Sequence, residues 1–167
     1  DGSITVPVMR AVARRHKNLV CLHIDSHTDA YAYDPADKYN AATQFTHVAE
    51  EGLLDATSSW PVGIRGTPCT NGVVPRARGL GYRVVPLDDL MRGGFSQRMA
   101  EFRDQAAGRP VYVCFDMDVF DPSCAPGVCS PSWGGLSARE GIVLIPTLTD
   151  LDIVADREGL ILLLEDG

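Results

Sequence analysis

The sequence predicts an α/β domain built on a mainly parallel sheet. Segments with helical spacing alternate with short apolar runs along the 167 residues. Such alternation is typical of parallel strands joined by helical crossovers. The apolar runs are continuous, as expected for strands that helices cover on both faces. The length fits one domain over residues 1–167.

The first half of the chain begins with a helix and a strand. Residues 3–16 carry apolar side chains at helical spacing and end in basic residues. Residues 18–24 form an apolar run that leads directly into Asp25, so we expect a buried strand there. The next expected elements are a helix over 42–54, a strand over 62–65 and a weak helix over 73–80.

The second half continues the alternation. The expected elements are a strand over 82–86, a helix over 96–107, a strand over 110–115, a helix opening at 137 and a strand over 151–155. The strand over 110–115 ends at Asp116, as the earlier one ends at Asp25. Ser137 and Glu140 have the spacing of a capping box, which marks a helix start.

Composition excludes several classes of protein. The formal net charge of −7 argues against binding to nucleic acid or to an anionic membrane, because both partners attract basic surfaces. No apolar run is long enough to span a bilayer, and no signal-peptide pattern is present. The five cysteines form no C-x-x-C pair, so we expect reduced thiols in a cytoplasmic protein.

Two acidic clusters carry the predicted chemistry. Asp25, His27 and Asp29 follow one predicted strand, and Asp116 and Asp118 follow another. Ligands of open α/β sheets bind at the carboxyl ends of strands, and residues two apart in extended chain point the same way. Converging carboxylates repel each other unless a cation lies between them. Carboxylates with one imidazole suit Mn²⁺ or Mg²⁺ better than structural zinc.

Other interpretations of these residues remain open at this point. Aspartates after strands are often helix caps, and a D-x-D pair after a strand also occurs in phosphoryl-transfer and phosphatase sites. Asp121 suits a supporting or loop role. His23 shares a face with Asp25 and is more typical of a core or supporting residue than of a ligand, and His47 is expected to be a surface or packing residue.

Several ordered motifs resemble the ureohydrolase family of arginases and agmatinases. The segments that carry the resemblance are Asp25-Ser-His27-Thr-Asp29, Val62-Gly-Ile-Arg65, Cys114-Phe-Asp116-Met-Asp118-Val-Phe-Asp121-Pro122, Ala125-Pro-Gly127 and Gly134-Gly-Leu-Ser-Ala-Arg-Glu140. They resemble the family's D-A-H-x-D, I-G-I-R, S-F-D-x-D-x-x-D-P, A-P-G and G-G-L-[ST]-x-R-E segments, in that order. The resemblance covers roughly residues 1–155 and is nearest the agmatinase and proclavaminate amidinohydrolase branch.

The resemblance implies a three-layer αβα fold and a hydrolase of C–N bonds in linear amidines. Two Mn²⁺ ions per chain are implied, with Asp25 and Asp116 bridging both, His27 and Asp118 completing one, and Asp29 serving the other. A metal-bridging hydroxide would attack a small guanidino substrate and release urea, because two cations lower the pKa of a shared water. A homo-oligomer is also implied.

The chain departs from the family pattern in three places. Gly2 stands where the family has a metal-binding His, and Ala41 stands where it has a His that works in proton transfer. Glu158 is a weak candidate for the acidic contact to the guanidinium. The domain is also expected to be incomplete at both ends, as a fragment or a shortened version. These departures support an alternative function, a catalytically impaired ureohydrolase-like protein that acts as a non-catalytic or assembly module.

Overall fold

A five-stranded parallel sheet forms the centre of the protein in the computed structural model, which describes residues 2–66 and 71–156. The strands are β1 (Val20–Ile24), β2 (Trp60–Ile64), β3 (Val85–Pro86), β4 (Val111–Phe115) and β5 (Ile153–Asp156). Their order across the sheet is β3-β2-β1-β4-β5. The α/β prediction is therefore confirmed, and β1 occupies the centre of the sheet.

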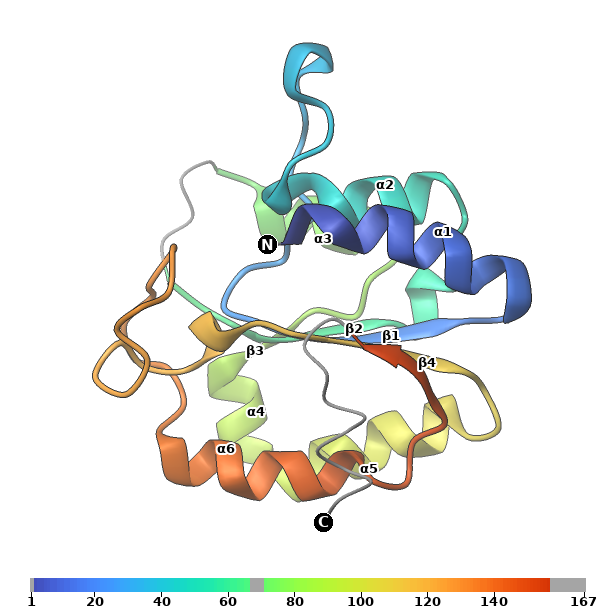
Figure 1. The fold of residues 1–167 in the computed structure, drawn as a ribbon. Helices are drawn as coiled ribbons and strands as arrows, with labels where there is room; N and C mark the ends of the chain where they lie inside the picture. The colour runs from blue at the N-terminus through green and yellow to red at the C-terminus, as the bar shows by residue number, and fades with distance from the viewer. Residues whose placement is uncertain (1, 67–70, 157–167) are drawn as a thin grey trace.

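Helices cover both faces of the sheet and give three layers (Figure 1). One layer contains α1 (Thr5–Arg15), α2 (Gln44–Glu50) and α3 (Val73–Gly79), and the other contains α4 (Leu87–Gly93), α5 (Phe95–Ala106) and α6 (Ala138–Leu144). Short 3₁₀ turns join them, at Gly2–Ile4, Pro35–Asp37, Ala41–Thr43, Ala56–Ser58, Met117–Val119 and Ile145–Leu148. Among the described residues, no helix has the length and apolarity needed to cross a bilayer.

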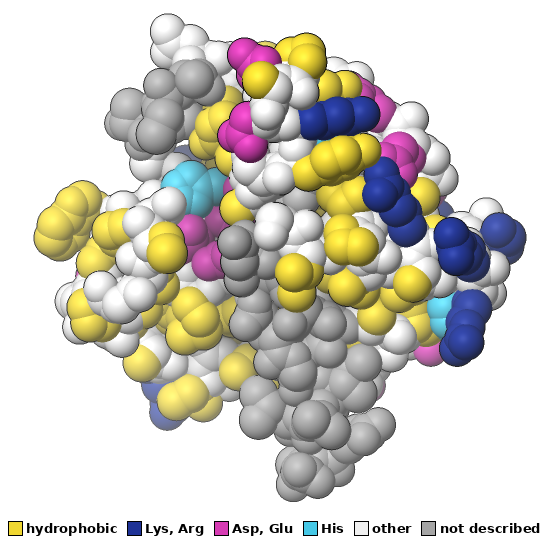
Figure 2. Space-filling view, turned by 45° about the horizontal axis from the view of Figure 1, so that its top comes forward, with side chains coloured by type: hydrophobic (Ala, Val, Ile, Leu, Met, Phe, Trp, Pro, Cys, Tyr) yellow, Lys and Arg dark blue, Asp and Glu magenta, His cyan; other side chains and the backbone are white. Residues whose placement is uncertain are grey.

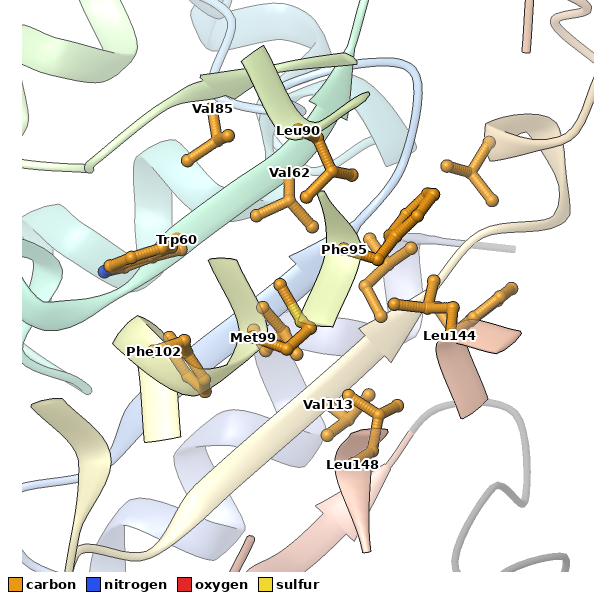
Figure 3. Close-up of a cluster of buried hydrophobic side chains, with 14 of the residues drawn as sticks. Trp60, Val62, Val85, Leu90, Phe95, Met99, Phe102, Val113, Leu144 and Leu148 are labelled. Atoms are coloured by element: carbon orange, nitrogen blue, oxygen red, sulfur yellow. The ribbon is translucent and has the colours of Figure 1, made fainter. Parts of the chain in front are cut away.

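Alternate residues of the central strands feed two separate cores. In β1, Val20, Leu22 and Ile24 pack with α4, α5 and α6, whereas Cys21 packs in the core beneath α1 and α2. Figure 3 shows the first core, where Val113 of β4 faces Met99 of α5 and Leu148. Because side chains alternate across a strand, the residues that follow Cys21 on the same face are His23 and Asp25. The strand therefore directs both toward the α1 and α2 layer.

The order of connections explains where a site forms. The chain runs outward from β1 through β2 to β3 with α2 and α3 on one face, and then returns to β4 and β5 with α4, α5 and α6 on the other. Adjacent strands β1 and β4 are paired in register from Val20↔Val111 to Ile24↔Phe115. Their connections leave in opposite directions, which opens a crevice at the carboxyl ends of the pair.

Several element boundaries differ from the sequence-based expectations. The helix expected over 42–54 is a 3₁₀ turn followed by α2, which ends at Glu50. The strand expected over 82–86 is only the two residues of β3, and the sequence reading missed α4 directly after it. The strand expected over 62–65 begins two residues earlier, at Trp60. The capping box at Ser137 and Glu140 is confirmed, with both reciprocal hydrogen bonds formed.

Candidate metal centre

The two acidic clusters meet where β1 and β4 end. Sheet pairing continues past the strands, because the Asp116 N–H donates to the Ile24 carbonyl at 2.8 Å and the Asp25 N–H donates to the Val62 carbonyl at 3.0 Å. Both aspartates are thereby fixed at the carboxyl edge by main-chain hydrogen bonds. The space-filling view shows a histidine directly beside acidic side chains on this part of the surface (Figure 2).

One group of potential ligands contains Asp25, His27 and Asp118, whose ligand atoms all lie within 4.8 Å of one another. The His27 Nδ1 atom lies 3.0 Å from Asp118 Oδ2 and 3.4 Å from Asp25 Oδ1. The hydroxyl and the N–H of Ser26 both donate to Asp118 Oδ1, at 2.9 and 3.1 Å. These bonds hold the carboxylate of the turn after β4 against the loop that follows β1.

A second group contains His23, Asp25 and Asp29, again with ligand atoms within 4.8 Å. The Nε2 atom of His23 lies 2.8 Å from Asp25 Oδ2. The amide of Gln44 donates to Asp29 Oδ2 from the start of α2. The two groups share Asp25 and contain one imidazole each, so the described residues form two adjoining sets of potential metal ligands.

The backbone explains how Asp29 reaches the second group. Its φ of +45° lies in the left-handed region, which aspartate tolerates better than most residues. The extended course that would carry Asp29 onto the face of Asp25 and His27 is therefore broken. The aspartate turns back toward α2, and its carbonyl accepts from the Phe45 N–H at 2.9 Å.

Asp116 lies in neither group. Its side chain accepts from the Asp118 N–H at 3.1 Å and caps the 3₁₀ turn Met117–Val119. This is a capping contact that is ordinary for aspartate after a strand, and the metal-ligand role of Asp116 stays a prediction. The structure brings together four of the five predicted ligands, namely Asp25, His27, Asp29 and Asp118, and adds His23, which the sequence reading assigned to a supporting role.

Burial and mutual charge shift the ionisation of these groups in different directions. Burial opposes ionisation of Asp25, but the charge of His23 and hydrogen bonds from His23 and His27 outweigh it and hold the Asp25 pKa below its usual range. Hydrogen bonds to Asp118 and Asp25 raise the pKa of His27 to about 10. Burial, followed by the charge of Asp25, raises the pKa of Asp29 to about 7. Burial also raises the pKa of Asp118.

The donor set fits a divalent cation that prefers oxygen and imidazole ligands. Asp25 is 1% exposed and Asp118 is 6% exposed. Among the described residues, neither these two nor Asp29 forms an ion pair with lysine or arginine. Carboxylates buried this deeply are costly unless a cation compensates them. Carboxylate-rich sites with imidazole suit Mn²⁺, whereas the described cysteines lie outside both groups.

Arg65, directly after β2, supports the site through hydrogen bonds to main-chain carbonyls. Its Nη2 donates to the carbonyls of Asp118, Phe120 and Ser132, and its Nε donates to the carbonyl of Trp133. The guanidinium thereby ties the loop after β4 to the segment that contains Trp133. In the sequence, only the resemblance to the family's I-G-I-R segment pointed to Arg65. The hydrogen-bond partners of Arg65 could not be predicted from that segment, because they lie far from it in sequence.

Asp121 organises the same loop. It accepts hydrogen bonds from the N–H groups of Ser123, Gly134 and Gly135. Hydrogen bonding with the Ser123 side chain, followed by these N–H groups, lowers the pKa of Asp121 to about 2. The predicted loop role of Asp121 agrees with these contacts. Trp133 is 82% exposed, so it is not part of the core.

The positions that depart from the family pattern lie close together. Gly2 is buried in the turn Gly2–Ile4, and this turn contacts the turn Ala41–Thr43. His47 cannot replace the imidazole missing at Ala41, because its Nε2 bonds the Lys38 carbonyl at 2.6 Å and its ring packs on Tyr33 and Tyr39. His47 is thus a buried packing residue. Glu158 lies outside the described residues.

A cleft of about 220 Å³ opens beside the first group. Its lining includes the polar residues Ser26, His27 and Arg65 and the more apolar residues Tyr31, Ile64 and Val73. The cleft gives a small molecule access to the His27 side, and a site of this kind typically combines apolar walls with a few polar groups.

Both the sequence and the fold resemble those of known proteins. The model of the arginase family matches residues 1–156. Proclavaminate amidinohydrolase of Streptomyces clavuligerus is 38% identical over 151 residues, which cover 90% of this chain and 48% of that protein. The mitochondrial guanidino acid hydrolase of Homo sapiens is 33% identical over 154 residues, covering 92% of this chain and 44% of the relative.

The fold comparison agrees. The solved structure of the Streptomyces clavuligerus proclavaminate amidinohydrolase superposes with a TM-score of 0.85 at 37% identity, covering 93% of this chain and 51% of that one. The arginase of Bacillus cereus superposes with a TM-score of 0.80 at 24% identity, which shows a shared fold. The chain spans about half the length of the curated relatives that it matches.

Proposed function

The chain belongs to the arginase family, and from this premise we propose that it provides the metal centre of a manganese-dependent amidinohydrolase. The reaction would be the hydrolysis of a C–N bond in a linear amidine, releasing urea from a guanidino compound. The observation that carries the proposal is the pair of adjoining ligand groups that share Asp25 at the carboxyl edge of the sheet.

Asp25, His27 and Asp118 would hold one cation, and Asp29 would serve the other together with Asp25. When bound, the cations supply Lewis-acid chemistry that lowers the pKa of a water molecule and yields a nucleophile at neutral pH. Ser26 keeps Asp118 oriented through two hydrogen bonds. Because the pKa of His27 is about 10 without metal, its imidazolium must lose a proton before it can become a ligand.

The substrate class follows from the relatives and from the cleft. Relatives at 32–38% identity are named as proclavaminate amidinohydrolase, guanidino acid hydrolase, agmatinase and guanidinobutyrase. We propose a small guanidino compound as the substrate, entering from the cleft that reaches His27. The carboxylates next to this cleft attract a guanidinium cation over short distances.

A second candidate function is favoured by Gly2 and Ala41. Neither residue has a side chain that binds a metal or moves a proton, and their turns are in contact. This observation supports a catalytically impaired member of the family that keeps the fold and a metal site as a non-catalytic or assembly module. A homo-oligomer in the cytoplasm is compatible with either candidate.

Urea release separates the two candidates. The purified chain is incubated with Mn²⁺ and agmatine, arginine or a guanidino acid, beside a metal-free sample and a variant with Asp25→Asn. Urea formed only by the Mn²⁺-loaded wild type supports the hydrolase. If the wild type forms none but the double variant Gly2→His with Ala41→His does, the impaired candidate is correct. If both fail to form urea while binding Mn²⁺, the amidinohydrolase proposal is wrong for this chain.

A further inference from the structure

His23 occupies an unusual place for a titratable side chain. It lies within the central strand β1, is 1% exposed, and points to the same face as Asp25 because the two residues are two positions apart. Its ring packs on Phe45 of α2, with ring centroids 4.2 Å apart. The neighbours of His23 on this face are mostly apolar, including Cys21 and Phe45. Packing alone would be satisfied by an apolar residue of similar size.

Only one of the two ring nitrogens of His23 has a hydrogen-bond partner among the described residues. Nε2 lies 2.8 Å from Asp25 Oδ2, whereas Nδ1 is buried and has no hydrogen-bond partner among the residues that the structure describes. Nε2 is therefore the ring nitrogen that faces the carboxylates, and it is the atom that could bind a cation there. Phe45 fixes the plane of the ring, which keeps Nε2 directed into the acidic cluster.

The positions of the three side chains suit a single cation. The ligand atoms of His23, Asp25 and Asp29 lie within 4.8 Å of one another. First-row divalent cations lie about 2.1 Å from nitrogen and oxygen ligands, so ligands on opposite sides of one ion are separated by about 4.2 Å. Small rotations of the carboxylates would close the difference. Asp29 has Gln44 as a further polar contact, and the uncharged amide does not neutralise it.

We propose that His23, Asp25 and Asp29 bind one divalent cation, with His23 providing an imidazole from inside the strand where Gly2 provides none. This inference rests on the proposed metal centre and assigns a ligand to it. The neighbouring cation would use Asp25, His27 and Asp118, so each ion would have one imidazole. The rival role for His23 is that of a positioning residue, whose Nε2–H donates to Asp25 and never contacts metal.

Electron spin echo spectroscopy of Mn²⁺ distinguishes these roles, because it detects ¹⁴N nuclei bound directly to the ion. The full chain has four histidines, so few variants are needed. In the variant His27→Asn, bound Mn²⁺ should still show coupling to one imidazole nitrogen, which would come from His23. In the double variant with His23→Gln this coupling should disappear, and one of two Mn²⁺ sites should bind at least tenfold more weakly.

Controls make each outcome decisive. His16→Gln, at the end of α1, should leave both the coupling and the metal count unchanged. Since His27 is part-exposed, His27→Asn is the variant expected to retain the fold, and it carries the deciding measurement even if His23→Gln unfolds. Bound Mn²⁺ without ¹⁴N coupling in His27→Asn would overturn the inference.

The same measurements separate this inference from the proposed function. If the ¹⁴N coupling is present but no urea forms, only the proposed hydrolase activity fails. If urea forms but the coupling is absent from His27→Asn, only the role of His23 fails. If elemental analysis finds no Mn²⁺ on the wild-type chain at millimolar metal, both are overturned.

Discussion

Asp55 and Asp25 lie at opposite ends of the same parallel sheet, and the protein neutralises their charges differently. Asp55, at the amino end, forms an ion pair with Arg109 at 2.9 Å and accepts hydrogen bonds from Thr57. Asp25, at the carboxyl end, is buried beside Asp29 and Asp118, and its ion-pair partners among the described residues are the imidazoles of His23 and His27. Asp55 is thus paired with an arginine, whereas the three carboxylates of Asp25, Asp29 and Asp118 share two imidazoles and no lysine or arginine ion pair among the described residues.

Arg65 makes this contrast informative. It is a guanidinium beside the acidic cluster, but its hydrogen bonds go to main-chain carbonyls, including that of Asp118, and not to the carboxylates. Burial lowers the pKa of Arg65, and the charges of nearby aspartates act against that effect. A cation that supports the loop and leaves the carboxylate oxygens available is what a metal centre requires.

The comparison predicts its largest effect at Asp25, the ligand that the two groups share. Asp25→Asn should weaken Mn²⁺ binding about 1000-fold, or about 4 kcal/mol, because both ions lose a carboxylate. Isothermal titration calorimetry measures the change. Asp104→Asn, on the exposed face of α5, is the control and should bind Mn²⁺ as the wild type does. Equal affinities of the two variants would place the metal elsewhere.

A backbone change beside the site gives the next effect. Gly63 has a φ of +94°, and a Cβ there would lie 2.8 Å from the Asp25 carbonyl oxygen. Gly63→Ala should lower the free energy of unfolding by about 3 kcal/mol, from strain at positive φ and from the clash. Gly52→Ala is the matched control, since its φ is +63° with no atom near the added methyl. It should cost about 1 kcal/mol in urea denaturation.

Asp29 tests whether the carboxyl end holds excess charge. Its pKa is raised to about 7, so at pH 8.5 the metal-free folded chain must keep a buried carboxylate ionised. Asp29→Asn should therefore stabilise the chelator-treated protein by about 1–2 kcal/mol at that pH. With saturating Mn²⁺ the sign should reverse, because the variant loses a ligand. Thermal melts with and without Mn²⁺ measure both changes in stability. If Asp29→Asn does not stabilise the metal-free protein, the proposed excess of acid at the carboxyl end of the sheet is wrong.

Local patterns were sufficient to predict the parts of this site that depend on single strands. The apolar runs before Asp25 and Asp116 predicted two buried strands, and the rule for open sheets placed both acids at one edge. The strand predicted over 82–86 ends where β3 ends but was begun three residues too early, because only Val85 and Pro86 pair with β2. The sequence-based prediction did not include α4, although Asp88 and Asp89 indicate a helix start, since acidic residues favour the first turn of a helix.

The ligand grouping could not be read from spacing. Residue spacing suggested that Asp25, His27 and Asp29 share a face, but the left-handed backbone at Asp29 redirects it toward His23 and Gln44. That conformation depends on the hydrogen bond to Phe45, which joins the loop to the start of α2. Spacing also could not predict that Asp116 caps the turn after β4, because capping and metal binding are both ordinary roles for an aspartate after a strand.

The smallest effect is expected at the compensated end. The hydrogen bond from Thr57, together with the contact to Arg109, holds the Asp55 pKa below its usual range, so its stabilisation is complete above pH 4 and is lost as the pH falls through the folded-state pKa. Since the ion pair is partly exposed, solvent screening limits Asp55→Asn to a loss of about 0.5–1 kcal/mol at pH 7. Urea denaturation should show a larger loss at pH 7 than at pH 2.5, because the lower pH lies between the unfolded-state and folded-state pKa values of Asp55. The loss should be the same with chelator and with Mn²⁺, because Asp55 lies at the end of the sheet away from the ligands. A dependence on Mn²⁺ would mean that the two ends are coupled and that the charge at the carboxyl end is compensated through the sheet.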